Sequence, residues 1–260
     1  MREKYITLQR PLLQDNIENN YNLSPMFFSL SAILRVHQSE FNDFGNISIS
    51  QIYEYFGYKI QERRKNVFID ILQAFKDLTE REMIELQNVT LDDLNNIAFD
   101  NIIKYRITDK FYDKKSFFKI PYECFQYIFC DDKFAIKKEN VFLVLCYITS
   151  MIWFRPKYKG IEAMADTIEN SPEAMWTTHK RLVEQTGLSI YTVKKCLDYL
   201  TQDQESHPAI LRFKNEIQIV EEKSFKQLPT VYAYHSDHVT DELMWGLKKL
   251  RKRRTEYSTL

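Results

Sequence analysis

The side chains best suited to chemistry lie in segment 177–200, where cations and hydroxyls alternate with apolar residues. Lysine and arginine bind phosphate groups whatever the sequence, whereas tyrosine and threonine hydroxyls can reach the edges of nucleic-acid bases. We therefore expect Lys194 and Lys195 to contact phosphates, and Tyr191 and Thr192 to contact bases. The candidate contacts in this segment are Lys180, Arg181, Ser189, Tyr191, Thr192, Lys194 and Lys195.

Two short helices joined by a turn would position these residues. Thr178 and Ser189 can cap the helices, because their hydroxyls accept hydrogen bonds from the first N–H groups, and Gly187 can adopt the left-handed conformation between them. In the second helix, apolar residues at spacings of three and four predict a buried face formed by Ile190, Val193, Leu197 and Leu200. The residues of this helix that then face outward are Tyr191, Thr192, Lys194, Lys195 and Asp198.

Strands are predicted after this pair of helices. Residues 210–213 and 217–220 are expected to form a hairpin around Asn215, since asparagine tolerates the left-handed conformation of a tight turn. A third strand at 231–234 would lie beside this hairpin, which we interpret as a wing. Two further candidate contacts belong to it: Arg212 and Lys214.

The first half of the chain predicts a similar series of elements. They are a helix over 24–38, a short strand over 47–50, a helix over 51–56 that Ser50 caps and Gly57 ends, a longer helix with its apolar face from Val67 to Leu78, and strands near 83–89 and 102–107. This order is that of a winged helix. The cluster Arg63, Arg64 and Lys65 opens the longer helix, where the helix dipole disfavours cations, so a nearby phosphate would stabilise it.

The second half is expected to repeat this plan. Its other elements are a strand over 117–121, an apolar helix over 139–153, an insertion over 155–176 with a short helix near 161–168, and a last helix from Asp241 capped by Thr240. That helix ends in segment 248–254, six cations in seven residues. A solvated helix end, DNA backbone contact and assembly are the alternatives for these cations.

The expected fold is mainly α with small β-wings (α+β), built from two winged helix-turn-helix modules. The expected domains are an N-terminal module at 1–115, a C-terminal module at 116–236, and a helix with a basic tail at 237–260.

The run KRLVEQTGLSIYTVKKCLDYL resembles the helix-turn-helix of bacterial winged-helix DNA-binding proteins, with Gly187 in the turn, Val193 six residues later and the small Cys196 nine residues after the glycine. The paired layout, with FFKIP before the apolar helix and LPTVYAY after the wing, is similar to replication initiators and replisome organisers of plasmids and phages from Gram-positive bacteria. This resemblance implies tandem winged helices that bind repeated origin sequences, with host replication proteins as partners.

Composition argues against several other classes. The 36 Lys+Arg balance 36 Asp+Glu, so any basic surface must be local, and the five glycines include no phosphate-binding loop. Four cysteines in apolar segments, without a CxxC motif, predict a reduced, cytoplasmic protein with buried thiols. The apolar run 141–154 is too short for a bilayer, so no membrane association is expected. His235 and His238 have no third ligand at suitable spacing, so neither a metal nor a cofactor is expected.

These observations favour a sequence-specific protein that binds double-stranded DNA without being an enzyme, and in particular a plasmid or phage replication initiator. A winged-helix transcriptional regulator is the alternative, because it would use the same helix. A nicking enzyme is less favoured, since no two histidines flank a single hydrophobic residue. Whether the chain forms a homodimer, and whether both modules contact DNA, is left open.

Overall fold

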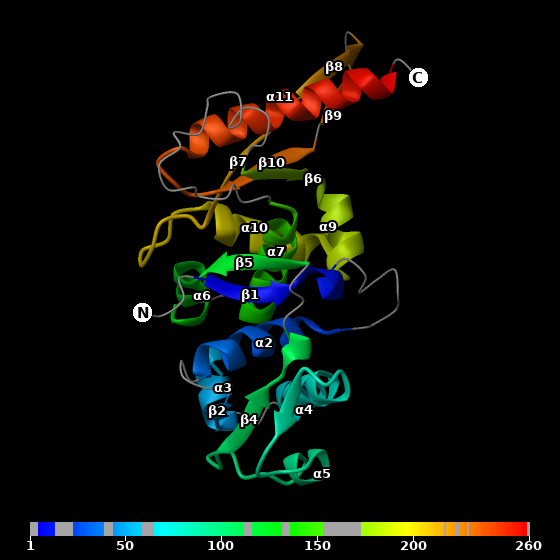
Figure 1. Cartoon of the computed structure of the whole chain (residues 1–260). Coiled ribbons are helices and arrows are strands. Elements are labelled where there is room, and N and C mark those ends of the chain that lie inside the picture. The colour runs from blue at the N-terminus through cyan, green and yellow to red at the C-terminus, as the bar shows by residue number, and fades with distance from the viewer. Residues whose placement is uncertain are drawn as a thin grey trace, which may run out of the picture. The chain divides into compact units, whose positions relative to one another are not determined.

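The computed structural model shows a mixed α and β protein with small antiparallel sheets (Figure 1). It describes residues 5–13, 23–38, 44–58, 65–111, 116–131, 136–152, 173–215, 217–221, 224–227 and 229–258. The chain divides into two compact units, unit 1 over residues 1–146 and unit 2 over residues 147–260. The coarse fold class predicted from the sequence is therefore confirmed.

Unit 1 contains a three-stranded sheet and helices on the buried side of its strands. Its main elements are α2 (Pro25–His37), β2 (Phe44–Ile47), α3 (Ile49–Phe56), α4 (Lys65–Glu80), β3 (Ile84–Leu86), α5 (Leu91–Leu94), β4 (Ile103–Ile107) and the 3-10 helix η1 (Asp109–Phe111). The strands lie in the order β2–β4–β3, so the last strand in sequence is central. Alternate residues of β4 are buried, because successive side chains of a strand point to opposite faces.

Local capping explains where the helices of unit 1 begin. Ser24 caps α2, as predicted, by accepting a hydrogen bond from the Phe27 N–H. Helix α3 begins earlier than predicted, because Ser48 and not Ser50 is its cap. The Ser48 hydroxyl accepts from the Gln51 N–H and the Gln51 side chain accepts from the Ser48 N–H, which forms a capping box. Ser50 instead donates to the Phe99 carbonyl in a distant loop.

The boundary of unit 1 lies later than the predicted end of the first module at residue 115. Strand β5 (Phe117–Pro121) pairs with the N-terminal strand β1 (Tyr5–Gln9), which ties residues after 115 to the start of the chain. Helix α6 (Tyr122–Phe129) adds aromatic contacts: the Phe129 ring lies 5.6 Å from that of Phe56 on α3. Pairing between distant segments, which is invisible in local patterns, therefore extends the unit.

Helix α7 (Lys138–Met151) is the apolar helix that the sequence predicts. Its residues from Val141 to Ile148 are all buried, as expected for a helix without a polar face. No helix in the described part of the chain has both the length and the apolar character needed to cross a membrane.

Among the cysteines, the prediction of buried thiols is wrong for Cys130, which is exposed just after α6.

Unit 2 contains a second three-stranded sheet with the same relative strand order. Its elements are β6 (Ala174–Thr177), α9 (His179–Thr186), α10 (Ile190–Thr201), β7 (Leu211–Lys214), β8 (Ile217–Glu221), β9 (Ser224–Gln227), β10 (Thr230–Tyr234) and α11 (Val239–Ser258). The strands lie in the order β6–β10–β7, again with the last strand central. The predicted insertion was wrong at its end, because residues 174–177 form β6. Its remaining residues 155–172, with the predicted short helix, lie outside the described residues.

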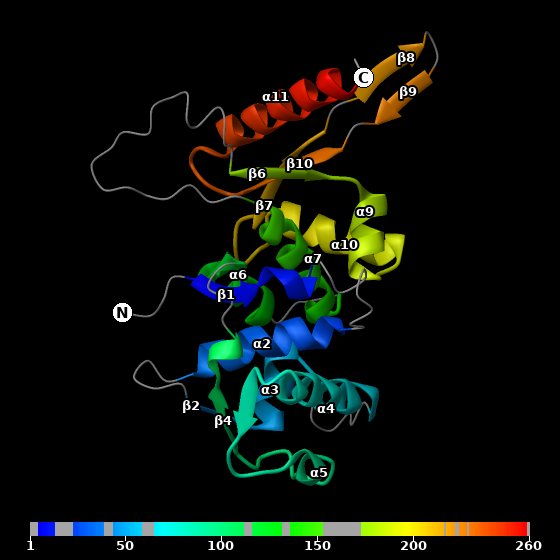
Figure 2. The same ribbon diagram turned by 45° about the vertical axis from the view of Figure 1, so that its right-hand side comes forward.

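The predicted hairpin between β7 and β8 is also wrong. Strand β7 pairs with β10, with Phe213 opposite Tyr232, and β8 pairs with β9 in a separate two-stranded hairpin (Figure 2). The Asn215 side chain accepts a hydrogen bond of 2.6 Å from the Thr230 hydroxyl at the start of β10. The sequence predicts a turn at Asn215, but its side chain instead links the end of β7 to the start of β10.

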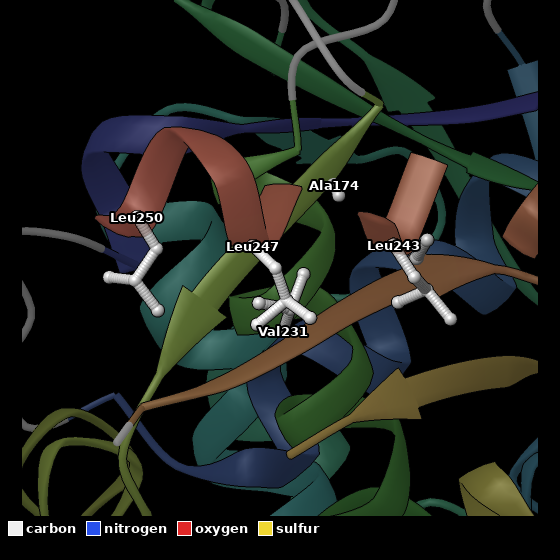
Figure 3. Packing of buried hydrophobic residues seen from close by; sticks show 6 residues of the cluster. Ala174, Val231, Leu243, Leu247 and Leu250 are labelled. Carbon is white, nitrogen blue, oxygen red and sulfur yellow. The ribbon is translucent and has the colours of Figure 1, made fainter. Parts of the chain in front are cut away.

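Helix α11 is packed on this sheet and belongs to unit 2. It begins at Val239, so Thr240 lies inside the helix and is not its cap. Leu243, Leu247 and Leu250 face Ala174 and Val231 on the sheet (Figure 3). A Cβ on Gly246 would lie 2.7 Å from Val231 Cγ1, so glycine allows the close approach of helix and strand.

Candidate nucleic-acid interface

The two helices predicted from segment 177–200 are present with the predicted caps. The Thr178 hydroxyl accepts a hydrogen bond of 3.1 Å from the Arg181 N–H at the start of α9. Gly187 has φ of 69° and donates to the Val183 carbonyl, which ends α9 in the left-handed conformation. The Ser189 hydroxyl accepts a hydrogen bond of 3.1 Å from the Thr192 N–H and starts α10. Local sequence therefore determines this turn.

One side of α10 is buried and the other faces solvent. The buried residues are Val193, Cys196, Leu197 and Leu200. Ile190 was predicted to point inward but is 47% exposed. Ile190 is the first residue of α10, and the buried residues begin one turn later at Val193. The regular spacing of apolar residues therefore extends one turn beyond the part of the helix that is buried. Ile190 is thus an exposed apolar residue at the helix start, a type of side chain that can contact a thymine methyl group.

Three of the predicted contacts lie together on the exposed side of α10. Lys194 and Lys195 are exposed, and Tyr191 is 64% exposed. The Lys195 ammonium lies 4.6 Å from the centre of the Tyr191 ring, within the range of a cation–π interaction. This contact holds an exposed ammonium group beside an exposed phenol ring on the same side of the helix.

Ser189 and Thr192, two of the predicted contacts, meet at the cap of α10. Their hydroxyl oxygens are 2.9 Å apart, and Thr192 is only partly exposed. Both hydroxyls are therefore engaged in the cap of α10. They position the helix start, where the N–H groups and the helix dipole favour an anion.

Helix α9 adds cations to the same pair of helices. Arg181 is exposed, and the Lys180 ammonium lies 3.8 Å from a Glu184 carboxylate oxygen, with the two side chains 86% and 56% exposed. Such an exposed pair contributes little to stability and is easily exchanged for a phosphate contact. Residues 179–201 contain four cations against the two carboxylates of Glu184 and Asp198, so these helices have a net positive charge.

Burial and the positive charge of these helices lower the pKa of His179, the first residue of α9. Burial lowers the pKa of His179 below its usual value, the nearby Lys194 ammonium lowers it further, and Asp198 opposes the shift. The imidazole is therefore neutral at pH 7 and lies near the Lys194 ammonium of the neighbouring helix.

The lowered pKa of His179 predicts a loss of stability in acid. Below about pH 6.5 the unfolded chain takes up a proton at this residue before the folded chain does. Stability is thus complete above that pH and falls as the pH is lowered through it. We expect His179→Gln to lose less stability than the parent between about pH 7.5 and 5.5, measured by urea unfolding. An equal loss in both proteins would contradict the role of His179.

The structure does not bring Arg212 and Lys214 to the exposed side of α10. Both residues pair with positions of β10, Ala233 and Val231, whose side chains face α11. The Arg212 guanidinium lies 2.7 Å from an Asp203 carboxylate oxygen and also donates to the His235 ring. The Lys214 ammonium contacts the Met244 sulfur of α11 at 3.1 Å. The sequence could not show this, because it depends on which face of β7 the helix covers.

The cations predicted to contact DNA in the first module are not described by the structure. Arg63 and Arg64 lie outside the described residues, and the side chain of Lys65, the first residue of α4, is likewise not described. The rest of α4 has an acidic outer face. Asp70 and Glu80 are exposed, Asp77 is partly exposed, and the exposed Lys76 lies 3.8 Å from Glu80. This face would repel phosphates.

The side chains on α9 and α10 offer ammonium, guanidinium and hydroxyl groups, which can bind anions and form hydrogen bonds. Within the described ranges, no group of three His, Cys, Asp or Glu side chains is placed to hold a metal ion. His235, which has the HxxH spacing with His238, accepts a hydrogen bond from Arg212.

The sequence matches no protein-family model, and no curated protein has significant similarity to it.

Proposed function

We propose that unit 2 is a non-catalytic module that binds double-stranded DNA sequence-specifically and places the start of α10 in the major groove. The observation that carries this proposal is the grouping of Tyr191, Lys194 and Lys195 on the exposed side of a capped helix. A major groove about 12 Å wide admits a helix, whose outward side chains then reach base edges and phosphates.

The architecture around α10 supports this proposal. Helix α9, the Gly187 turn and α10 lie between β6 and β7 in sequence, and the β8–β9 hairpin extends from the sheet (Figure 1). This is the element order of a winged helix, with the second helix of the turn as the reading helix and the hairpin as the wing. Unit 1 has the same relative strand order in its sheet, which supports a tandem arrangement.

Within this proposal, the chain is a plasmid or phage replication initiator that marks an origin and recruits host replication proteins. Unit 2 would read the DNA. The acidic outer face of α4 suits a protein partner better than a phosphate backbone, so unit 1 would serve recruitment or self-association.

Changing Lys194 and Lys195 together to Ala tests the proposal. Each lost phosphate contact is expected to reduce the slope of log K against log salt by up to about 0.9. The double variant should bind duplex DNA roughly 10- to 30-fold more weakly at about 0.15 M salt, for specific and random sequences alike. Fluorescence anisotropy with a labelled duplex selected by the parent chain from a random pool measures both quantities.

Two comparisons make this test specific. Tyr191→Ala should mainly reduce the ratio of specific to random binding, because base contacts provide discrimination. Lys76→Ala with Lys104→Ala removes the same charge from exposed positions of unit 1 and should leave the affinity unchanged. If the Lys194 and Lys195 variant binds like the parent, α10 does not lie in the groove.

A further inference from the structure

Strand β3 lies at one edge of the sheet of unit 1. Among the described strands it pairs only with β4. In an antiparallel ladder, residues whose peptide groups bond to the partner strand alternate with residues whose peptide groups point away from it. The Met83 carbonyl and the Gln87 N–H both bond to the backbone of segment 104–108, which fixes the phase of this alternation. The peptide groups of Ile84 and Leu86 therefore point to the open edge, where another strand can pair with them.

A groove of about 730 Å³ lies along this strand, a volume typical of ligand sites in proteins. It is lined by all three residues of β3 and by segment 89–91, which leads into α5. Leu86, Val89 and Leu91 are half-buried, so a ligand in the groove can contact their side chains. The chain thus offers open backbone groups and apolar side chains at one place, which is the combination that binds an extended peptide.

Local hydrogen bonds hold one wall of the groove in place. The Asn88 side chain donates to the Ile102 carbonyl at 2.7 Å and accepts from the Lys104 N–H at 2.8 Å. Thr90 and Asp93 form a capping box at the start of α5. The wall is therefore ordered before a partner binds, which reduces the free-energy cost of binding.

The segment that forms the groove is acidic. Residues 77–110 contain eight Asp+Glu and four Lys+Arg, a net charge of −4 in a chain whose total charge is zero. Both cations that line the groove lie against its carboxylates: the Arg106 guanidinium is 2.6 Å from a Glu85 oxygen, and the Lys110 ammonium contacts Glu82. These pairs are exposed, so a partner can exchange with them at little cost. A basic partner complements this segment, whereas a phosphate backbone would be repelled.

The same charge disfavours a second copy of this chain at the open edge. Pairing of β3 with β3 of another copy would bring together two segments that each have a net charge of −4. It would also place two Glu85 side chains on neighbouring strands, and like charges on neighbouring strands destabilise a sheet.

We propose that the open edge of β3 binds an extended segment of a partner protein in which apolar residues alternate with lysine or arginine. The alternation follows from the pleat, because Ile84 and Leu86 point to one face of the sheet and Glu85 points to the other. The added strand pairs with the backbone of Ile84 and Leu86, and its cations lie on the face of Glu85. This surface would serve the recruitment assigned to unit 1, and in that respect the inference rests on the proposed function.

The probe is a fluorescein-labelled nonapeptide of alternating valine and lysine, added to the full chain without DNA. Hydrogen exchange measured by NMR should slow at the Ile84 and Leu86 amides, because a strand paired at the open edge protects their N–H groups. A matched peptide of alternating valine and glutamate should bind roughly 10-fold more weakly or less, because it places like charges together.

The charge of the groove is tested by Glu82→Gln with Glu85→Gln. This double variant should bind the lysine peptide roughly 3- to 10-fold more weakly, since each exposed ion pair contributes modestly. Glu54→Gln with Glu123→Gln removes the same charge from exposed positions of unit 1 outside the lining of the groove and should bind like the parent. Unchanged urea unfolding curves of the two variants show that the fold is intact.

The proposal is overturned if the lysine peptide does not bind, if it binds without slowing exchange at Ile84 and Leu86, or if the two double variants bind it equally well. It is also overturned if exchange at these residues slows when the concentration of the chain alone is raised, since a second copy would then occupy the edge. These measurements need no DNA, so they are distinguishable from a failure of the Lys194 and Lys195 test.

Discussion

Lys138→Met is expected to lower the free energy of unfolding of unit 1 by about 2–5 kcal/mol. Lys138 is 3% exposed, and its ammonium donates to the Phe129 carbonyl at 2.9 Å and the Tyr55 carbonyl at 3.2 Å. These carbonyls lie in the last turns of α6 and α3, where backbone oxygens have no partner within the helix. One buried cation therefore caps two helices, at the end of each that favours positive charge. Methionine would leave both carbonyls without this donor.

Urea unfolding followed by circular dichroism measures this effect. All three tryptophans, Trp153, Trp176 and Trp245, lie in unit 2, so their fluorescence reports on that unit. The variant should lose helical signal at lower urea, before the fluorescence changes. Lys137→Met is the matched control, because the Lys137 side chain is 60% exposed and lies 3.9 Å from a Glu139 carboxylate oxygen. A Lys138 variant as stable as this control would show that the two carbonyl contacts do not matter.

Leu247→Ala is expected to destabilise unit 2 by about 2–5 kcal/mol, the usual cost of removing a buried leucine side chain. Leu247 is 3% exposed and lies in the centre of the cluster that joins α11 to Ala174 and Val231 (Figure 3). Neighbouring side chains cannot close the cavity fully, because Gly246 already brings the helix close to Val231.

Tryptophan fluorescence in urea measures the stability of unit 2, since Trp245 is on α11 itself. Met244→Ala is the control on the same helix: Met244 is 47% exposed, and its loss should cost less than about 1 kcal/mol. Equal effects of the two substitutions would mean that α11 is not held by its leucine stripe.

The helix boundaries around the candidate interface could be predicted from the sequence because they depend on near neighbours. Thr178 and Ser189 bond to N–H groups three residues ahead, and Gly187 adopts a conformation that other residues rarely take. The same holds for Ser24 and Gly57 in unit 1. Each signal and its consequence lie within one helical turn, so no distant contact is needed to recognise them.

Only the tertiary structure decided which distant segments meet and which faces they cover. Pairing of β7 with β10 turned Asn215 from a predicted turn residue into a partner of Thr230. Arg212 and Lys214 lie on the face of the sheet that α11 covers, and therefore away from α10. Apolar spacing marks the side of an element that can be buried, but not where the core ends, which is why Ile190 proved to be exposed. These outcomes depend on strand pairing and packing between residues far apart in sequence, and a local pattern carries no information about them.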